Sequence, residues 1–148
     1  MENTDNYYVI NQIVMITGLT DRTIRSYIAS GFLQGEKIDS IWHFTPEQVE
    51  AFIQIPEVKL AIRAKNKRLV YDFLLDDFKK EDEACIILDL PNADRKIVME
   101  EFADRITNSP YQNIHFSFDK NGNTPRVILK GKLDDVLEIV NAYKAALT

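Results

Sequence analysis

Apolar residues in the first part of the chain recur at the spacing of short helices. Residues 12–17 follow Asn11, a good helix cap. The apolar side of this predicted helix consists of Ile13, Val14 and Ile16. The pattern then breaks at Gly18-Leu19, which predicts a tight turn before the next element.

A second short helix is predicted within residues 20–33. Thr20 is a good N-cap, and Gly31 stands where a left-handed residue would end the helix. Ile24 and Ile28 are four positions apart and can face a core. The opposite face carries donors for phosphates and base edges, namely Arg22, Arg25 and Ser26. Two helices joined by a glycine turn predict a helix-turn-helix.

The next segments predict a β-ribbon and a third helix. Residues 32–44 suit two strands that close on a turn at Asp39-Ser40. Thr45-Pro46 with Gln48 is a capping box with proline at the first helical position, and Pro56 ends or bends that helix.

Residues 57–82 contain no glycine or proline and predict one long helix. Its apolar positions form a narrow stripe of Ile62, Leu69, Val70, Phe73, Leu74 and Phe78. Such a stripe requires a partner. One interpretation is an antiparallel helix pair between two subunits, and the other is packing on the chain's own C-terminal part.

The remaining chain alternates strand and helix patterns. Residues 84–90 are a nearly continuous apolar run, and residues 93–107 predict a helix with an inner face of Ile97, Val98, Phe102 and Ile106. Residues 114–118 and 126–130 predict strands around an Asn-Gly turn, and a last helix starts at Asp134-Asp135.

We therefore expect an α+β protein with three parts. These are a winged helix-turn-helix over residues 1–56, a linker or dimerisation helix over 57–82, and a small βαββα domain over 83–148. The last part is expected to serve self-association or ligand sensing.

Composition excludes several classes of protein. The 148 residues are 45% hydrophobic and 28% charged, as in globular proteins. No apolar run approaches the ~20 residues of a membrane span, and the polar N-terminus does not resemble a signal peptide, so we expect a cytoplasmic protein without membrane contact. Cys85 is the single cysteine, and with His43 and His115 far apart in sequence no metal site is expected. No catalytic or cofactor motif is present, so an enzyme is not expected.

The charge distribution limits DNA binding. The net charge is −5, and residues 1–56 hold three Lys/Arg against seven Asp/Glu, a local net of −4. Affinity for DNA comes largely from phosphate neutralisation, so one copy should bind weakly and depend on a second.

Residues 9–53 resemble the N-terminal winged-helix domain of the MerR family of transcription regulators. The resemblance rests on Gly18-Leu19, on residues 22–27 (Arg-Thr-Ile-Arg-Ser-Tyr) and on Gly31-Phe32-Leu33. It implies DNA contacts by Arg22, Arg25 and Tyr27, a positioning role for Thr23, and dimerisation through a long helix.

The ribbon departs from that family. The position of its usual arginine is taken by Trp42 or, one place along, by His43. The aromatic ribbon and the following helix start also resemble the excisionase-like winged helices. The complete set of candidate DNA-binding residues is Arg22, Thr23, Arg25, Ser26, Tyr27, Lys37, Trp42 and His43.

We expect a sequence-specific DNA-binding transcription regulator that acts as a homodimer on double-stranded DNA. The alternatives are a protein-interaction adaptor with a degenerate winged helix and an excisionase-like architectural protein. A small-molecule effector is also considered, in a pocket between the C-terminal sheet and a partner subunit lined by Tyr111, Phe116, Phe118 and Tyr143.

Overall fold

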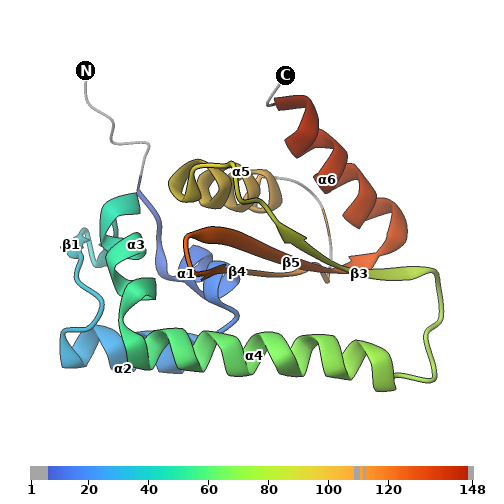
Figure 1. The fold of residues 1–148 in the computed structure, drawn as a ribbon. Coiled ribbons are helices and arrows are strands. Elements are labelled where there is room, and N and C mark those ends of the chain that lie inside the picture. Colours follow the sequence, from blue (N-terminus) through green and yellow to red (C-terminus); the bar gives the residue numbers. More distant parts are fainter. Residues whose placement is uncertain (1–6, 109–110, 112, 147–148) are drawn as a thin grey trace.

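The computed structural model describes residues 7–108, 111 and 113–146, and these form six helices and two small antiparallel sheets (Figure 1). The predicted α+β class is confirmed. The chain begins with two helices, a β-hairpin and two further helices. A βαββα region follows.

Helix α1 (Ile10–Thr17) begins earlier than the sequence predicted. The amide of Val9 donates to the Gln12 Oε1 atom at 2.9 Å, and Val9 has extended backbone angles. Asn11 therefore lies inside the helix, and the prediction that it is the cap was wrong. The cap is Val9, whose backbone amide is bonded by the Gln12 side chain.

Helix α2 (Asp21–Ser30) has the predicted boundaries. The Thr20 hydroxyl accepts a hydrogen bond from the Thr23 amide at 3.1 Å, and Gly31 ends the helix with φ 86°. The hairpin that follows pairs β1 (Glu36–Ile38) with β2 (Ile41–His43). Its turn residues Asp39 and Ser40 both have positive φ, as a two-residue hairpin turn of type I′ requires.

Helix α3 (Pro46–Gln54) starts with the predicted capping box at Thr45, and α4 (Pro56–Leu75) follows it directly. The predicted helix over 57–82 was too long. Asp76 accepts a hydrogen bond from the Phe78 amide at 3.0 Å, and Lys79 Nζ donates to the carbonyl of Phe73 at 2.6 Å. These side-chain bonds replace continued helical bonds and end α4 near Leu75.

The C-terminal sheet has the strand order β3-β5-β4 and is entirely antiparallel. Its strands are β3 (Glu83–Asp89), β4 (His115–Asn121) and β5 (Thr124–Lys132). The predicted hairpin is confirmed, and its strands are longer than expected because Asn121 pairs with Thr124 across a turn of two residues.

Helices α5 (Arg95–Thr107) and α6 (Leu133–Ala146) cover one face of this sheet, and α4 lies under the other (Figure 1). On α5 the inner face differs from the predicted one. Val98 and Phe102 are buried as expected, but Ile97 is 54% exposed and Met99 takes its place in the core.

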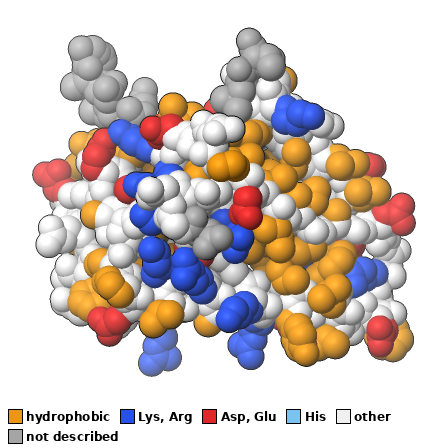
Figure 2. Space-filling view, viewed as in Figure 1, with side chains coloured by type: hydrophobic (Ala, Val, Ile, Leu, Met, Phe, Trp, Pro, Cys, Tyr) orange, Lys and Arg blue, Asp and Glu red, His pale blue; other side chains and the backbone are white. Residues whose placement is uncertain are grey.

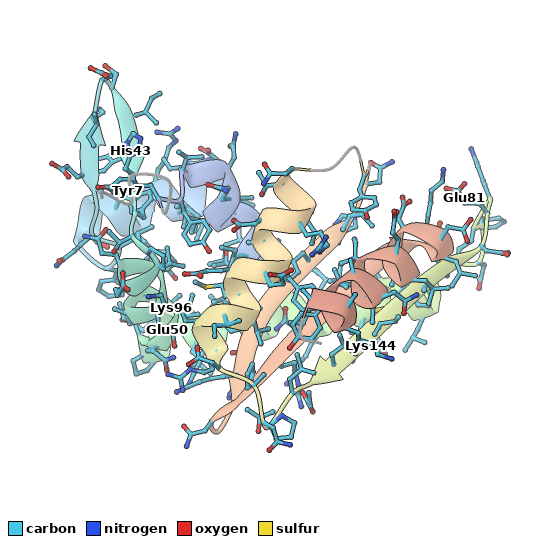
Figure 3. The ribbon with its side chains drawn as sticks, turned by 90° about the horizontal axis from the view of Figure 1, so that it is seen from above. Tyr7, His43, Glu50, Glu81, Lys96 and Lys144 are labelled. Atoms are coloured by element: carbon cyan, nitrogen blue, oxygen red, sulfur yellow. The ribbon has the colours of Figure 1, made fainter. Side chains whose placement is uncertain are left out.

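One hydrophobic core runs through all three predicted parts. Ile24 of α2, Ile62 of α4 and Phe118 of β4 are all fully buried members of the same cluster. Helix α1 packs against β4, and α3 is tied to α5 by an ion pair between Glu50 and Arg95 at 2.9 Å. Figure 3 shows Glu50 beside Lys96, where α3 meets α5.

Candidate nucleic-acid interface

The outward face of α2 carries the predicted donors. Arg22, Arg25 and Ser26 are exposed, while Ile24 on the opposite side is fully buried. Arg25 Nε forms an ion pair with Asp21 Oδ1 at 2.7 Å one turn earlier. Within the described part of the chain Arg22 has no such partner. Arg22 is therefore the cation on this helix that is free to meet a phosphate.

Thr23 and Tyr27 are held by neighbouring side chains. The Thr23 hydroxyl accepts a hydrogen bond from the Thr20 hydroxyl at 2.9 Å. The Tyr27 ring stacks on Phe32 with a centroid distance of 5.6 Å and meets the edge of Phe52 at 5.4 Å. These contacts fix the orientation of α2 relative to α3.

The hairpin presents aromatic side chains and one lysine. Lys37 pairs across the hairpin with Trp42, and its Nζ lies 5.8 Å from the centre of the Trp42 ring. His43 is half-buried, and its ring packs edge-on against Tyr7 at 5.3 Å, as their neighbouring labels in Figure 3 show. The turn at the tip consists of the exposed polar Asp39 and Ser40, and the exposed apolar Ile38 and Ile41 flank it.

The fold assembles a basic cluster that sequence reasoning did not assign to any site. Lys59 and Arg63 of α4 meet Arg95 of α5 and Lys120 of β4, and Arg63 Nη2 donates to the Lys120 carbonyl at 2.9 Å. Partial burial, followed by repulsion from Arg95 and Lys59, lowers the pKa of the Lys120 ammonium. Arg63 also pairs with Asp119 at 3.2 Å. Figure 2 shows Lys and Arg side chains gathered near the middle of one face.

The predicted dimerisation residues differ in exposure, and one of them lies outside α4. Ile62 is fully buried in the chain's own core and is not available to a partner, so this residue was wrongly assigned. Leu69, Val70 and Phe73 are half-buried. Leu74 is exposed, and Phe78 is exposed but lies beyond the end of the helix, so it does not continue the stripe. The inner side of α4 therefore packs on the chain's own C-terminal sheet, which was the alternative to a helix pair between two subunits.

A different stripe occupies the outward side of α4. Its residues are alternately four and three positions apart and are all exposed: Leu60, Ala64, Lys67, Tyr71 and Leu74. This is the spacing of a coiled-coil seam. The sequence contains both stripes at helical spacing, and only the packing reveals which of them faces outward.

The aromatic residues of the predicted effector pocket are part of the core. Phe116, Phe118 and Tyr143 are buried, and Phe102 stacks on Tyr143 at 4.7 Å and on Phe116 at 6.1 Å. Tyr111 is half-buried at a separate surface hollow. These four residues therefore do not form the predicted pocket.

Other chemistry finds little support in the described residues. Cys85 is partly buried, and burial raises the pKa of its thiol, which lowers its reactivity. Among the residues that the structure describes, no group of three His, Cys, Asp or Glu side chains could hold a metal ion. No described helix is both long and apolar enough to cross a bilayer.

Comparison with protein-family models, with curated proteins and with solved structures finds no match to this chain.

Proposed function

We propose that the protein is a sequence-specific DNA-binding transcription regulator that acts as a homodimer. The observation that carries this proposal is α2, a capped helix whose buried side is braced by the core and whose outward side presents Arg22, Arg25 and Ser26. In a winged helix-turn-helix, such a helix enters the major groove, where arginine reads guanine and contacts phosphates.

The resemblance of residues 9–53 to the MerR family supports this reading. In the proposed complex α1 braces α2, and the hairpin of β1 and β2 is the wing. Tyr27 acts mainly by fixing α2 against α3, since its ring is packed between Phe32 and Phe52. Lys37 is the cation of the hairpin, and its ammonium lies over the ring of Trp42.

The proposal is tested by fluorescence polarisation with DNA from the chain's own upstream region, over a range of salt concentrations. Arg22→Ala combined with Arg25→Ala should weaken binding and flatten the slope of log K against log salt by about 0.9 for each lost phosphate contact. Lys144→Ala is the matched control, because Lys144 is an exposed cation on α6, far from α2 in Figure 3. Binding that is absent in the wild type, or equal in the control and the double variant, contradicts the proposal.

The homodimer is proposed to form through the outward stripe of α4. In an antiparallel pair centred on Lys67, Leu60 faces the partner's Leu74, and the small Ala64 lies within one residue of the level of the partner's large Tyr71. The apolar residues of the seam therefore complement a second copy of the seam in size, and Lys67 is the position that does not. Helix α4 has 20 residues and is about 30 Å long, which is enough for two heptads.

Lys67 sits at the two-fold axis of this pair, where it meets the partner's Lys67. The repulsion fixes the register at a cost in stability, as a single polar core position does in coiled coils. Lys67→Leu should therefore tighten the dimer, and Leu74→Asp should abolish it. Ile97→Asp, a substitution of an exposed apolar residue on α5, is the control that leaves the dimer intact.

Sedimentation velocity measures these effects across a range of protein concentrations. Added salt should strengthen the wild-type dimer by screening the two lysines, the opposite of its effect on DNA binding. A wild-type monomer at high concentration, or a dimer unaffected by Leu74→Asp, rules out this seam.

An adaptor function is favoured by a different observation, the exposed Ile38 and Ile41 at the hairpin tip beside an acidic front segment. Exposed apolar residues beside the turn suit a protein surface better than a phosphate backbone. Ile38→Ser with Ile41→Ser distinguishes the two functions. Unchanged DNA affinity combined with loss of a protein partner from pull-downs would support the adaptor.

A further inference from the structure

A cavity of about 370 Å³ lies between α1, α4 and β4. Its size is within the range of about 300–1,000 Å³ that small-molecule sites occupy. Val14 and Met15 of α1, Leu69 of α4 and Ile114 before β4 supply apolar wall. The cavity is distinct from the outward face of α2 and from the outward stripe of α4.

Two buried polar side chains line this cavity without partners. Asn66 of α4 is 7% exposed and Ser117 of β4 is 2% exposed. Among the described residues, neither Asn66 Oδ1 nor Ser117 Oγ has a hydrogen-bond partner. A buried polar group without a partner has lost its bonds to water without replacement, so a ligand that supplies the missing bonds would recover that cost.

These two atoms differ from the other unpartnered buried polar atoms of the described residues. Glu50 Oε1 and Arg105 Nε also have no partner, but each belongs to a side chain that is already in an ion pair, with Arg95 and Glu101 respectively. The side chains of Asn66 and Ser117 take part in no ion pair, and both side chains line the same cavity.

The rim of the cavity sets the charge of its ligand. Lys65 and Arg68 line it, and neither has an ion pair within the described part of the chain, whereas Asp72 is the single acidic residue among the lining side chains. Burial, reinforced by Lys130, lowers the pKa of the lining His115, so its imidazole is neutral at pH 7. The rim therefore has a net positive charge.

We propose that this cavity binds a small organic anion with an apolar body and a hydrogen-bond donor. The donor meets Asn66 Oδ1, the apolar body packs between Met15 and Leu69, and the anionic group pairs with Lys65 or Arg68. The site touches α1, α4 and β4 together, so a bound ligand fixes α1 relative to the sheet. Any effect on DNA affinity would follow from that contact and rests on the proposed function.

Three compounds with one ring skeleton test the ligand chemistry. 4-Hydroxyphenylacetate has both the anion and the donor, phenylacetate lacks the donor, and tyramine replaces the anion with a cation. Titration of the isotope-labelled full-length protein, followed by amide chemical shifts, should show 4-hydroxyphenylacetate binding at the cavity with a dissociation constant of about 1 mM or tighter. Phenylacetate and tyramine should each bind at least about tenfold more weakly, the loss expected for one hydrogen bond or charge pair.

Variants locate the binding in the protein. Asn66→Leu and Ser117→Ala remove an unpartnered polar atom, so both variants should fold and be at least as stable as the wild type. Asn66→Leu should weaken 4-hydroxyphenylacetate binding about tenfold, as should Arg68→Gln. Lys144→Gln, which removes an exposed cation on α6 outside the cavity, should leave binding unchanged.

Four outcomes would overturn the proposal. These are no binding by the wild type, equal binding of all three compounds, shift changes away from α1, α4 and β4, and undiminished binding by Asn66→Leu. Each of them would mean that this cavity does not recognise an organic anion through Asn66 and its basic rim. The titration contains no DNA, so its result is independent of whether α2 binds DNA.

Discussion

Replacing Ile62 with alanine tests whether the front and back of the chain share one core. Ile62 is fully buried on the inner side of α4, between the N-terminal helices and the C-terminal sheet. The substitution removes three carbon atoms, a loss of about 2.4 kcal/mol at about 0.8 kcal/mol for each buried group. The cavity left behind adds about 1 kcal/mol, so we expect a destabilisation of about 3.5 kcal/mol.

Urea unfolding followed by two signals measures this effect. Trp42 is the single tryptophan and reports on the hairpin at the front, whereas far-ultraviolet circular dichroism reports on all helices and strands. With one core, the two unfolding curves should coincide in the wild type and should shift together in Ile62→Ala. The melting temperature should fall by roughly 7–14 °C, at 2–4 °C for each kcal/mol in a chain of this size.

The reasoning is refuted if the circular dichroism curve shows a second transition that Trp42 does not follow. It is also refuted if Ile62→Ala lowers the free energy of unfolding only at protein concentrations where dimers form, because Ile62 would then contact a partner. Ile97→Ala is the control. Its side chain is 54% exposed on α5, so the same class of substitution should change stability by less than about 0.5 kcal/mol.

Three further predictions concern local features. Thr20→Ala removes the cap of α2, whose hydroxyl accepts from the Thr23 amide at 3.1 Å, and should cost about 1 kcal/mol in urea unfolding, whereas Thr20→Asp keeps the cap and should cost little. Gly35→Ala would place a Cβ 2.4 Å from the Phe44 ring and should lower the free energy of unfolding by about 1–3 kcal/mol; an unchanged midpoint would contradict this packing. Burial raises the pKa of the Glu100 carboxyl above its ordinary value of 4.5, so the folded state binds this proton more tightly than the unfolded state does. Wild-type stability should therefore fall as pH rises from 4.5 through the raised pKa, and Glu100→Gln should lose this dependence and be more stable at pH 7, as pH-dependent urea unfolding would reveal.

Features that depend on a few neighbouring residues could be predicted from the sequence. The cap at Thr20, the left-handed Gly31 and the capping box at Thr45 all lie where their residue types indicated. The order of helices and strands followed in the same way, from periodicity and turn residues. The end of α4 could not be predicted, because it depends on Asp76 and Lys79 side chains that bond to the backbone in place of further helical turns.

Features that depend on packing could not be predicted. Helix α4 has two stripes at nearly the same spacing, one around Ile62 and one around Leu60, and periodicity cannot say which is buried. The answer is set by the sheet, which follows α4 in the chain and covers the Ile62 side. The basic cluster has the same origin, because Arg95 and Lys120 come close to Lys59 only through the fold.

Asn66 links these observations to the proposed ligand site. It lies on the inner side of α4, between the buried Ile62 and the half-buried Leu69, where an apolar residue would complete the stripe. Ser117 of β4 points to the opposite face of the strand from Phe116 and Phe118, and it is buried there although it is polar. Each residue therefore buries a polar atom without a partner at an energetic cost, and both line one cavity. Coinciding departures from an otherwise consistent pattern are expected at functional sites, where stability is given up for binding. Two unrelated packing defects would have no reason to share a cavity.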